Sequence, residues 1–194
     1  MTTPVSGDVP VLQTASSLTV LTLSTYQSLQ ALPFGGGSTS LGPLRDLIAA
    51  ALDELARART DLADATRAAG GRVQQAPNPR YAPVVAQALP TVRGPGDVVG
   101  LALTLEDVLA QTLVRDVVDL AAPSVRRTVT GHAAAAARRK ALLLTLQALL
   151  SSGGAALVAV PPDLGALPPG VGTVGFPDVL FPTEKASPST EGAV

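Results

Sequence analysis

The sequence contains no cysteine and no tryptophan, and only one of its 194 residues is a histidine. Without cysteine, disulfides, thiolate catalysis and thiolate metal sites are all excluded. Aromatic residues make up only 3% of the chain. The core must therefore be built from alanine, leucine and valine, which favours closely packed helices over a β-sandwich.

The sequence also lacks the features of a secretory signal and of a membrane span. The first basic residue is Arg45, so the N-terminus lacks the charged start of a secretory signal. No apolar run reaches the roughly eighteen residues of a membrane span. The net charge of −1 argues against nucleic acid as a partner. As written, the sequence predicts a cytoplasmic protein without membrane insertion, but the compartment stays open, because a protein without cysteine is compatible with either side of a membrane.

Hydrophobic periodicity predicts four long helices, at about residues 11–32, 43–69, 97–121 and 123–152. We expect residues 1–10 to form an N-terminal arm, and residues 155–194, which hold seven prolines, to form an ordered or partly ordered tail. The first and last helix pairs are joined by short loops, whereas a long proline-rich connection separates the second helix from the third. Two antiparallel hairpins tied by one long connection are typical of ferritin-like bundles. The predicted fold is therefore an all-α, ferritin-like four-helix bundle over residues 11–154.

One acidic residue interrupts an apolar stripe on the third predicted helix. Glu106 lies at helical spacing among apolar residues, namely Val99, Leu103, Ala110, Leu113, Val117 and Leu120. A bare carboxylate buried there would cost several kcal/mol, so it must be paired, protonated or bound to a metal. His132 and Arg139 lie seven residues apart on one side of the fourth helix. We predict that Arg139 neutralises Glu106, because its planar guanidinium fits a carboxylate best; a metal held by Glu106 and His132 is the alternative.

Other charged residues are interpreted as solvated or paired between helices. On the second helix, Glu54 and Asp61 flank the apolar stripe, and the acids of this helix are assigned to a solvated face. The third helix is acidic, with Asp107 and Asp116 among its carboxylates, and the fourth is basic. This complementarity predicts charge pairs between the two helices. Gly131 inside the fourth helix marks a kink, a close helix approach or a break.

A short internal echo suggests that the two hairpins are duplicates. The residues Leu21-Thr22-Leu23-Ser24 match Leu103-Thr104-Leu105-Glu106 at an offset of 82. The double glycines that follow the second and fourth helices, at 70 and 153, are offset by 83. If the hairpins are duplicates, Ser24 occupies the position where its counterpart carries Glu106.

Three motifs carry a resemblance to a known family. They are GGRVQQAPNPRYAPVV after the second helix, LALTLEDVLAQT in the third and VGFPDVLFPT in the tail. With these motifs, residues 11–183 resemble the bacterial ferritin-like domain family that includes desiccation-related proteins, in its actinobacterial branch. The resemblance implies a ferritin-like fold and, in members with an intact site, di-iron chemistry. Such sites use a glutamate from each of two helices and a Glu-x-x-His motif from each of the other two.

Most of these ligands are missing when the family pattern is carried onto this chain. The glutamate of the first helix would fall at Ser24, and the motif of the second helix falls on RARTD at residues 57–61. In the fourth helix the motif falls on HAAA, beginning at His132. Glu106 alone stands where a ligand is expected. Ser24, Glu106 and His132 are therefore interpreted as the remnant of a lost di-iron site.

These observations lead to one preferred function and two alternatives. The preferred hypothesis is a metal-free structural protein that forms a homodimer or pairs with a ferritin-like paralogue, and no cofactor or catalytic residue is predicted. The first alternative is an iron-binding oxidase or iron-handling stress protein that uses a reduced site around Glu106 and His132. The second is a bundle that holds a small apolar ligand between its helices.

Overall fold

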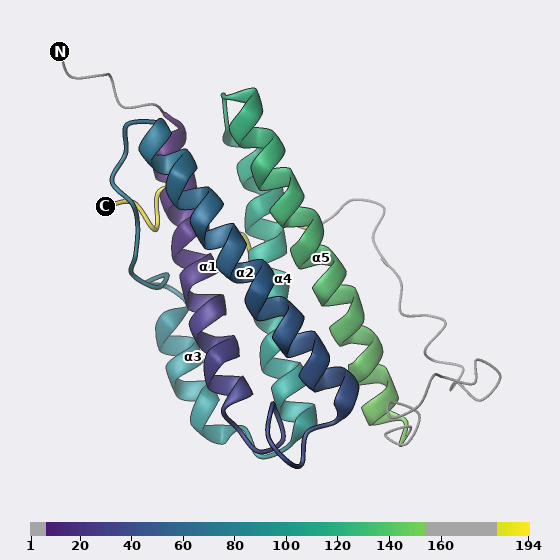
Figure 1. Cartoon of the computed structure of the whole chain (residues 1–194). Helices are drawn as coiled ribbons and strands as arrows, with labels where there is room; N and C mark the ends of the chain where they lie inside the picture. The colour runs from purple at the N-terminus through teal and green to yellow at the C-terminus, as the bar shows by residue number, and fades with distance from the viewer. Residues whose placement is uncertain (1–6, 154–181) are drawn as a thin grey trace.

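The computed structural model describes residues 7–153 and 182–194, and all regular secondary structure in these ranges is helical (Figure 1). Strands are absent from these ranges. The helices are, in chain order, α1 (Asp8–Gln30), α2 (Gly42–Ala68), α3 (Ala82–Ala88), a short 3₁₀ turn η1 (Leu89–Thr91), α4 (Pro95–Asp119) and α5 (Pro123–Ser151). Among them, no helix is both long enough and apolar enough to cross a membrane.

The four long helices surround one hydrophobic core as two packed hairpins. Helix α1 packs against α2, and α4 packs against α5; α1 also contacts α4, and α2 contacts α5. The C-terminal ends of α2 and α4 both lie beside the start of α1, because Gly71 abuts Val9 and the carboxylate of Asp8 accepts the amides of Ala121 and Ala122. The connection between α2 and α4, which includes α3, must therefore return along the length of the bundle (Figure 1).

Proline and glycine set the helix ends close to their predicted positions. The four long helices begin and end within three residues of the bounds expected from the sequence. Pro95 and Pro123 open α4 and α5, where a missing amide proton costs nothing. Gly70 and Gly153 follow α2 and α5 with φ of 80° and 74°, the left-handed conformation that glycine adopts without strain. The predicted N-terminal arm is shorter than expected, because α1 already begins at Asp8.

Helix α1 is buried on nearly all sides, so it lacks the polar outer face of an ordinary surface helix. Except for Thr14, its serine and threonine hydroxyls donate to backbone carbonyls of the same helix. Ser16, Thr19, Thr22 and Thr25 each donate to the carbonyl four residues earlier, at 2.8–2.9 Å. This local bonding allows small polar side chains to be buried without partners on other helices.

Residues 182–194 cover part of α1 and are here called segment 182–194. The hydroxyl of Thr14 donates to the carbonyl of Ser189 at 3.0 Å and accepts the amide of Gly192 at 3.0 Å. Gln74 in the connection donates to the Gly192 carbonyl at 2.7 Å. The amide of Ser187 donates to Thr112 on α4 at 2.9 Å. This part of the expected tail therefore packs on its own bundle, whereas the rest of that tail lies outside the described residues.

Gly192 lies so close to α1 that a side chain there would collide with the helix. An added Cβ would come within 2.6 Å of the Ser17 hydroxyl and 2.7 Å of the Thr14 Cα. Gly131, in contrast, lies within an uninterrupted α5, and a Cβ there would meet no atom within 4 Å. The sequence interpretation of Gly131 as a break or close approach was therefore wrong.

We expect Gly192→Ala to detach segment 182–194 from α1 and to lower the free energy of unfolding by about 1–3 kcal/mol, as overpacking usually does. The measurements are limited proteolysis, which should cut the variant sooner near residue 192, and chemical denaturation. Gly131→Ala is the matched control and should raise stability by about 1 kcal/mol, since alanine favours a helix interior. Equal protease resistance of Gly192→Ala and the wild type would contradict the packing described here.

Candidate functional site

A buried ion-pair network occupies the middle of the bundle. Arg139 on α5 donates from Nε to one oxygen of Glu106 at 2.8 Å and from one terminal nitrogen to the other oxygen at 2.9 Å. Its remaining terminal nitrogen donates to Glu54 on α2 at 2.7 Å. Glu106 has no exposed surface, and the Arg139 side chain is 6% exposed. One guanidinium therefore joins carboxylates from two other helices, and the pair predicted from the sequence lies together in the structure.

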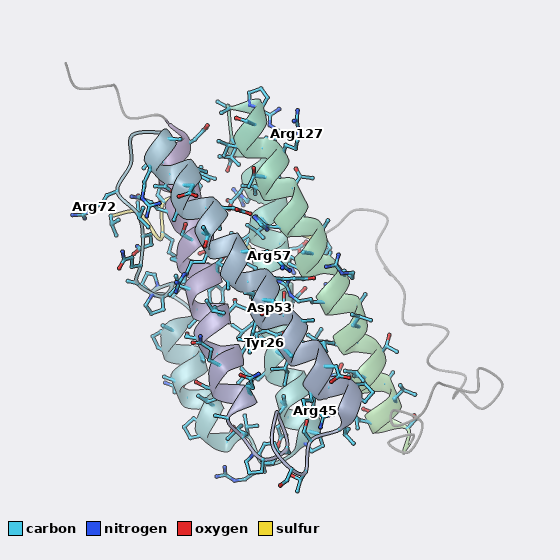
Figure 2. All side chains as sticks on the ribbon, in the orientation of Figure 1. Tyr26, Arg45, Asp53, Arg57, Arg72 and Arg127 are labelled. Carbon is cyan, nitrogen blue, oxygen red and sulfur yellow. The ribbon has the colours of Figure 1, made fainter. Side chains whose placement is uncertain are left out.

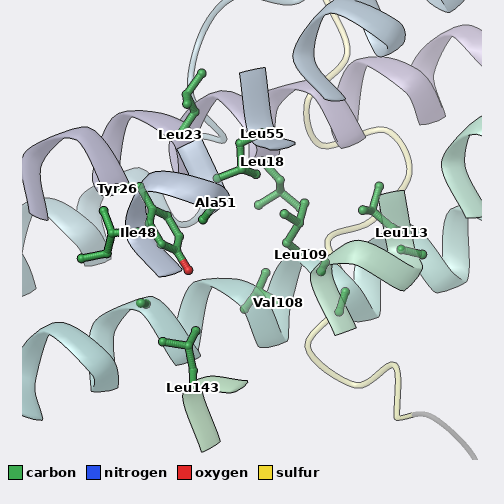
Figure 3. Packing of buried hydrophobic residues seen from close by; sticks show 14 of the residues in the cluster. Leu18, Leu23, Tyr26, Ile48, Ala51, Leu55, Val108, Leu109, Leu113 and Leu143 are labelled. Atoms are coloured by element: carbon green, nitrogen blue, oxygen red, sulfur yellow. The ribbon is translucent and has the colours of Figure 1, made fainter. Parts of the chain in front are cut away.

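Two further residues lie at the edge of this network, Arg138 of α5 and Tyr26 of α1. Arg138 donates to the second oxygen of Glu54 at 2.6 Å, nearer the surface. From α1, the Tyr26 hydroxyl points across the core toward α4 (Figure 3). This hydroxyl lies near the Glu106 carboxylate without a well-formed hydrogen bond to it. Each of the four long helices thus supplies one side chain to the centre.

Burial and charge act against each other in the network. Burial raises the pKa of Glu106, and the neighbouring Arg139 charge only partly offsets this effect. Burial also raises the pKa of Tyr26, and the Glu106 charge adds to that shift. For Glu54, which is closer to the surface, the hydrogen bond and charge of Arg139 outweigh burial, so its pKa is lowered. The network is balanced in charge, because Glu54 and Glu106 face Arg138 and Arg139.

A second cluster joins the two helices of the α4–α5 hairpin to segment 182–194. The Asp107 carboxylate accepts hydrogen bonds from Lys140 of α5 and Lys185 of that segment, each at 2.6 Å. It also accepts one from the Gln111 side chain at 3.0 Å. These hydrogen bonds outweigh burial and lower the pKa of Asp107. The predicted pairing between acidic and basic helices is thus present at Asp107, as it is at Glu106.

Ser24, predicted as the counterpart of Glu106, does not face the bundle centre. Its side chain is exposed on α1, and its hydroxyl donates to the Leu21 carbonyl at 2.9 Å. Tyr26, which is fully buried, is the residue of α1 that faces Glu106. Two residues along a helix change direction by about 200°, so the matched sequence letters place Ser24 on the opposite side. The expected position of Ser24 was therefore wrong.

His132 contacts α2 rather than Glu106. Its Nε2 lies 3.1 Å from an oxygen of Asp61, in an alignment that does not form a good hydrogen bond. Burial lowers the pKa of His132 more than the Asp61 charge raises it, which favours the neutral imidazole at pH 7. The alternative metal site of the sequence analysis needed His132 and Glu106 together, and the contacts of His132 do not join it to Glu106.

Glu54 was missed because the acids of α2 were assigned to solvent. Asp53, its neighbour, does lie on the exposed outer side of α2 with Arg57 (Figure 2), whereas Glu54 turns toward α5. A signal was present in the spacing: Glu54 and Asp61 are seven residues apart on α2, and His132 and Arg139 are seven apart on α5. In antiparallel helices, these equal intervals match as two interhelical pairs.

Asp116 is the second site that the sequence analysis did not find. It lies on α4 and is 1% exposed, and neither carboxylate oxygen has a hydrogen-bond partner in the part of the chain that the structure describes. The predicted pairing with the basic helix was wrong at this position. Burial, with a smaller contribution from the Asp119 charge, raises the pKa of Asp116 to about 8. Asp116 is therefore mostly protonated at neutral pH.

The described residues offer no group of three or more histidine, aspartate and glutamate side chains able to hold a metal ion. Both oxygens of Glu106 already bind Arg139. No protein-family model matches the chain, and the searches of curated proteins and of solved structures also gave no match. The structure thus shows a helical bundle with a buried ion-pair network at its centre.

Removing one partner of the central pair should destabilise the fold more than removing both. We expect Arg139→Leu and Glu106→Leu each to lower the free energy of unfolding by about 3 kcal/mol, because each leaves a buried polar group without its partner. The double variant Glu106→Leu/Arg139→Leu should lose less than the sum of the single variants. Chemical denaturation measures all three, and additive losses would contradict a direct pair.

Asp116 should make the protein less stable as the pH rises. Its folded pKa of about 8 exceeds the ordinary value of 3.8, so the folded state binds the proton more tightly. The free energy of unfolding therefore falls as the pH rises from about 4 to about 8. We expect Asp116→Asn to stabilise the protein at pH 8.5 by a few kcal/mol and much less at pH 5. Denaturation at the two pH values tests this, with the exposed Asp53→Asn on α2 as the control; an equal effect of Asp116→Asn at both pH values would contradict it.

Proposed function

We propose that this protein is a ferritin-like bundle in which an internal ion pair has replaced the di-iron site, and that its role is structural. Two features support the ferritin-like assignment. The two hairpins are tied by one connection that returns along the bundle, which is the layout of ferritin-like folds. All four long helices also direct a side chain to a common polar centre, where such folds hold their metal ions.

The observation that carries the proposal is the position of the Arg139 guanidinium. It fills the space between Glu106 and Glu54 and bonds to three of their four carboxylate oxygens. Two carboxylates that face each other inside a bundle need a cation, and here the chain supplies it. A metal ion could bind these oxygens only by displacing a buried arginine, which would then lose its charge partners. This displacement cost favours a metal-free bundle.

A metal-free bundle without a catalytic set acts through its surfaces. We propose that the chain associates with a second copy as a homodimer, with a ferritin-like paralogue as the other candidate partner. The buried network suits this role because it fixes the relative positions of α2, α4 and α5 without any bound ion. A rigid bundle presents its outer surface to a partner at little entropic cost.

Elemental analysis together with native mass spectrometry tests the proposal. The purified protein, incubated with Fe(II) in air and then desalted, should carry no stoichiometric iron and should oxidise Fe(II) no faster than buffer. The native mass should be that of a dimer. One or two iron ions per chain, lost in both Glu106→Gln and His132→Ala, would overturn the proposal and favour the iron-handling alternative. A monomeric mass at micromolar concentration would contradict self-association.

A further inference from the structure

A pocket of about 350 Å³ lies away from the ion-pair network, on the side of α2 that faces the connection. It is formed between α1, α2 and the residues that follow Arg72. Its walls include Val20 of α1, Arg59, Ala63 and Arg67 of α2, and Val73 and Gln74 of the connection. A space of this size lies within the range of small-molecule sites and exceeds what a single bare oxyanion needs.

The charged side chains in the wall of this pocket are all positive. Among the described residues that line it, Arg59 and Arg67 are the charged ones. Arg59 forms no ion pair among the described residues. Arg67 pairs with Asp64 at 2.6 Å, but both side chains are more than 60% exposed, so that pair holds Arg67 only weakly. In a chain of net charge −1, the pocket is a local concentration of positive charge.

The pocket also has an apolar wall beside the two arginines. Arg59, Ala63 and Arg67 follow one another at intervals of four residues, so they lie along one side of α2. Ala63, Val20 and Val73 supply the hydrocarbon part of the wall. Gln74 forms a fixed wall, because its amide nitrogen donates to the Gly192 carbonyl at 2.7 Å and its oxygen accepts the Ala76 amide at 2.8 Å. Segment 182–194 thereby helps to hold the pocket open.

We propose that this pocket binds a small organic dianion, in which Arg59 and Arg67 hold the negative charge and the carbon skeleton rests on Val20, Ala63 and Val73. Guanidinium groups bind phosphate and carboxylate oxygens through paired hydrogen bonds, and two of them match a doubly charged ligand. A phosphomonoester and a dicarboxylate both have this chemistry. The proposal is independent of the metal-free role above, because neither arginine belongs to the Glu54–Arg139–Glu106 network.

Isothermal titration calorimetry with glycerol 3-phosphate and with glutarate tests the site and distinguishes the two ligand types. The wild type should bind at least one of them saturably, and the tighter of the two identifies the ligand class. Arg59→Gln and Arg67→Gln should each weaken binding by about tenfold or more, as the loss of a charge-assisted hydrogen bond does. Asp64→Asn should strengthen it, because Arg67 is then released from its competing carboxylate.

Arg45→Gln is the matched control for these variants. Arg45 is an exposed arginine at the opposite end of α2, outside the pocket (Figure 2). Its replacement changes the net charge by the same amount and should leave binding unchanged. The proposal is overturned if neither dianion binds saturably, or if Arg45→Gln weakens binding as much as Arg59→Gln. Circular dichroism of each variant verifies that the fold is retained.

Discussion

The bundle depends on one buried cation, the guanidinium of Arg139. An isolated charge in an apolar core costs far more than a folded domain of this size can tolerate. Here, Glu106 and Glu54 surround that charge from two other helices, and three hydrogen bonds of 2.7–2.9 Å hold it. Because α2, α4 and α5 all contribute, none of them can slide or rotate without breaking one of these hydrogen bonds. The network therefore fixes the helix register as well as balancing charge.

A second constraint is the polar character of α1. An ordinary surface helix would turn its serine and threonine side chains to water. Helix α1 instead packs against α2 and α4, and segment 182–194 covers another part of it. Thr14 and Gln13 bind the backbone of that segment, and Gln74 and Asn78 bind it from the connection. Segment 182–194, the connection and α1 thus form one hydrogen-bonded unit, far apart in sequence but adjacent in space.

The two proposals draw on different parts of this architecture. At the centre of the bundle, the carboxylates of Glu54 and Glu106 are paired with Arg139. Among the described residues, no group of carboxylates and histidines is therefore free to hold a metal ion. The arginines of the pocket between α2 and the connection are less well paired, since Arg59 forms no ion pair with any residue that the structure describes and Arg67 pairs only at the surface. The centre and the pocket thus differ in charge balance, because the cations of the centre face buried or half-buried carboxylates whereas those of the pocket do not.

The sequence by itself determined the local features of this protein. Proline, glycine and the 3.6-residue period set the helix bounds to within three residues, and the lone acid in an apolar stripe required a partner for Glu106. Those signals are local, because helix hydrogen bonds and helix faces depend on residues only a few positions apart. Tertiary structure alone decided that Tyr26 rather than Ser24 faces the centre, that Glu54 turns inward and that Asp116 is buried with no hydrogen-bond partner among the described residues. These outcomes depend on how helices rotate and align against one another, which is set by packing between residues far apart in the chain.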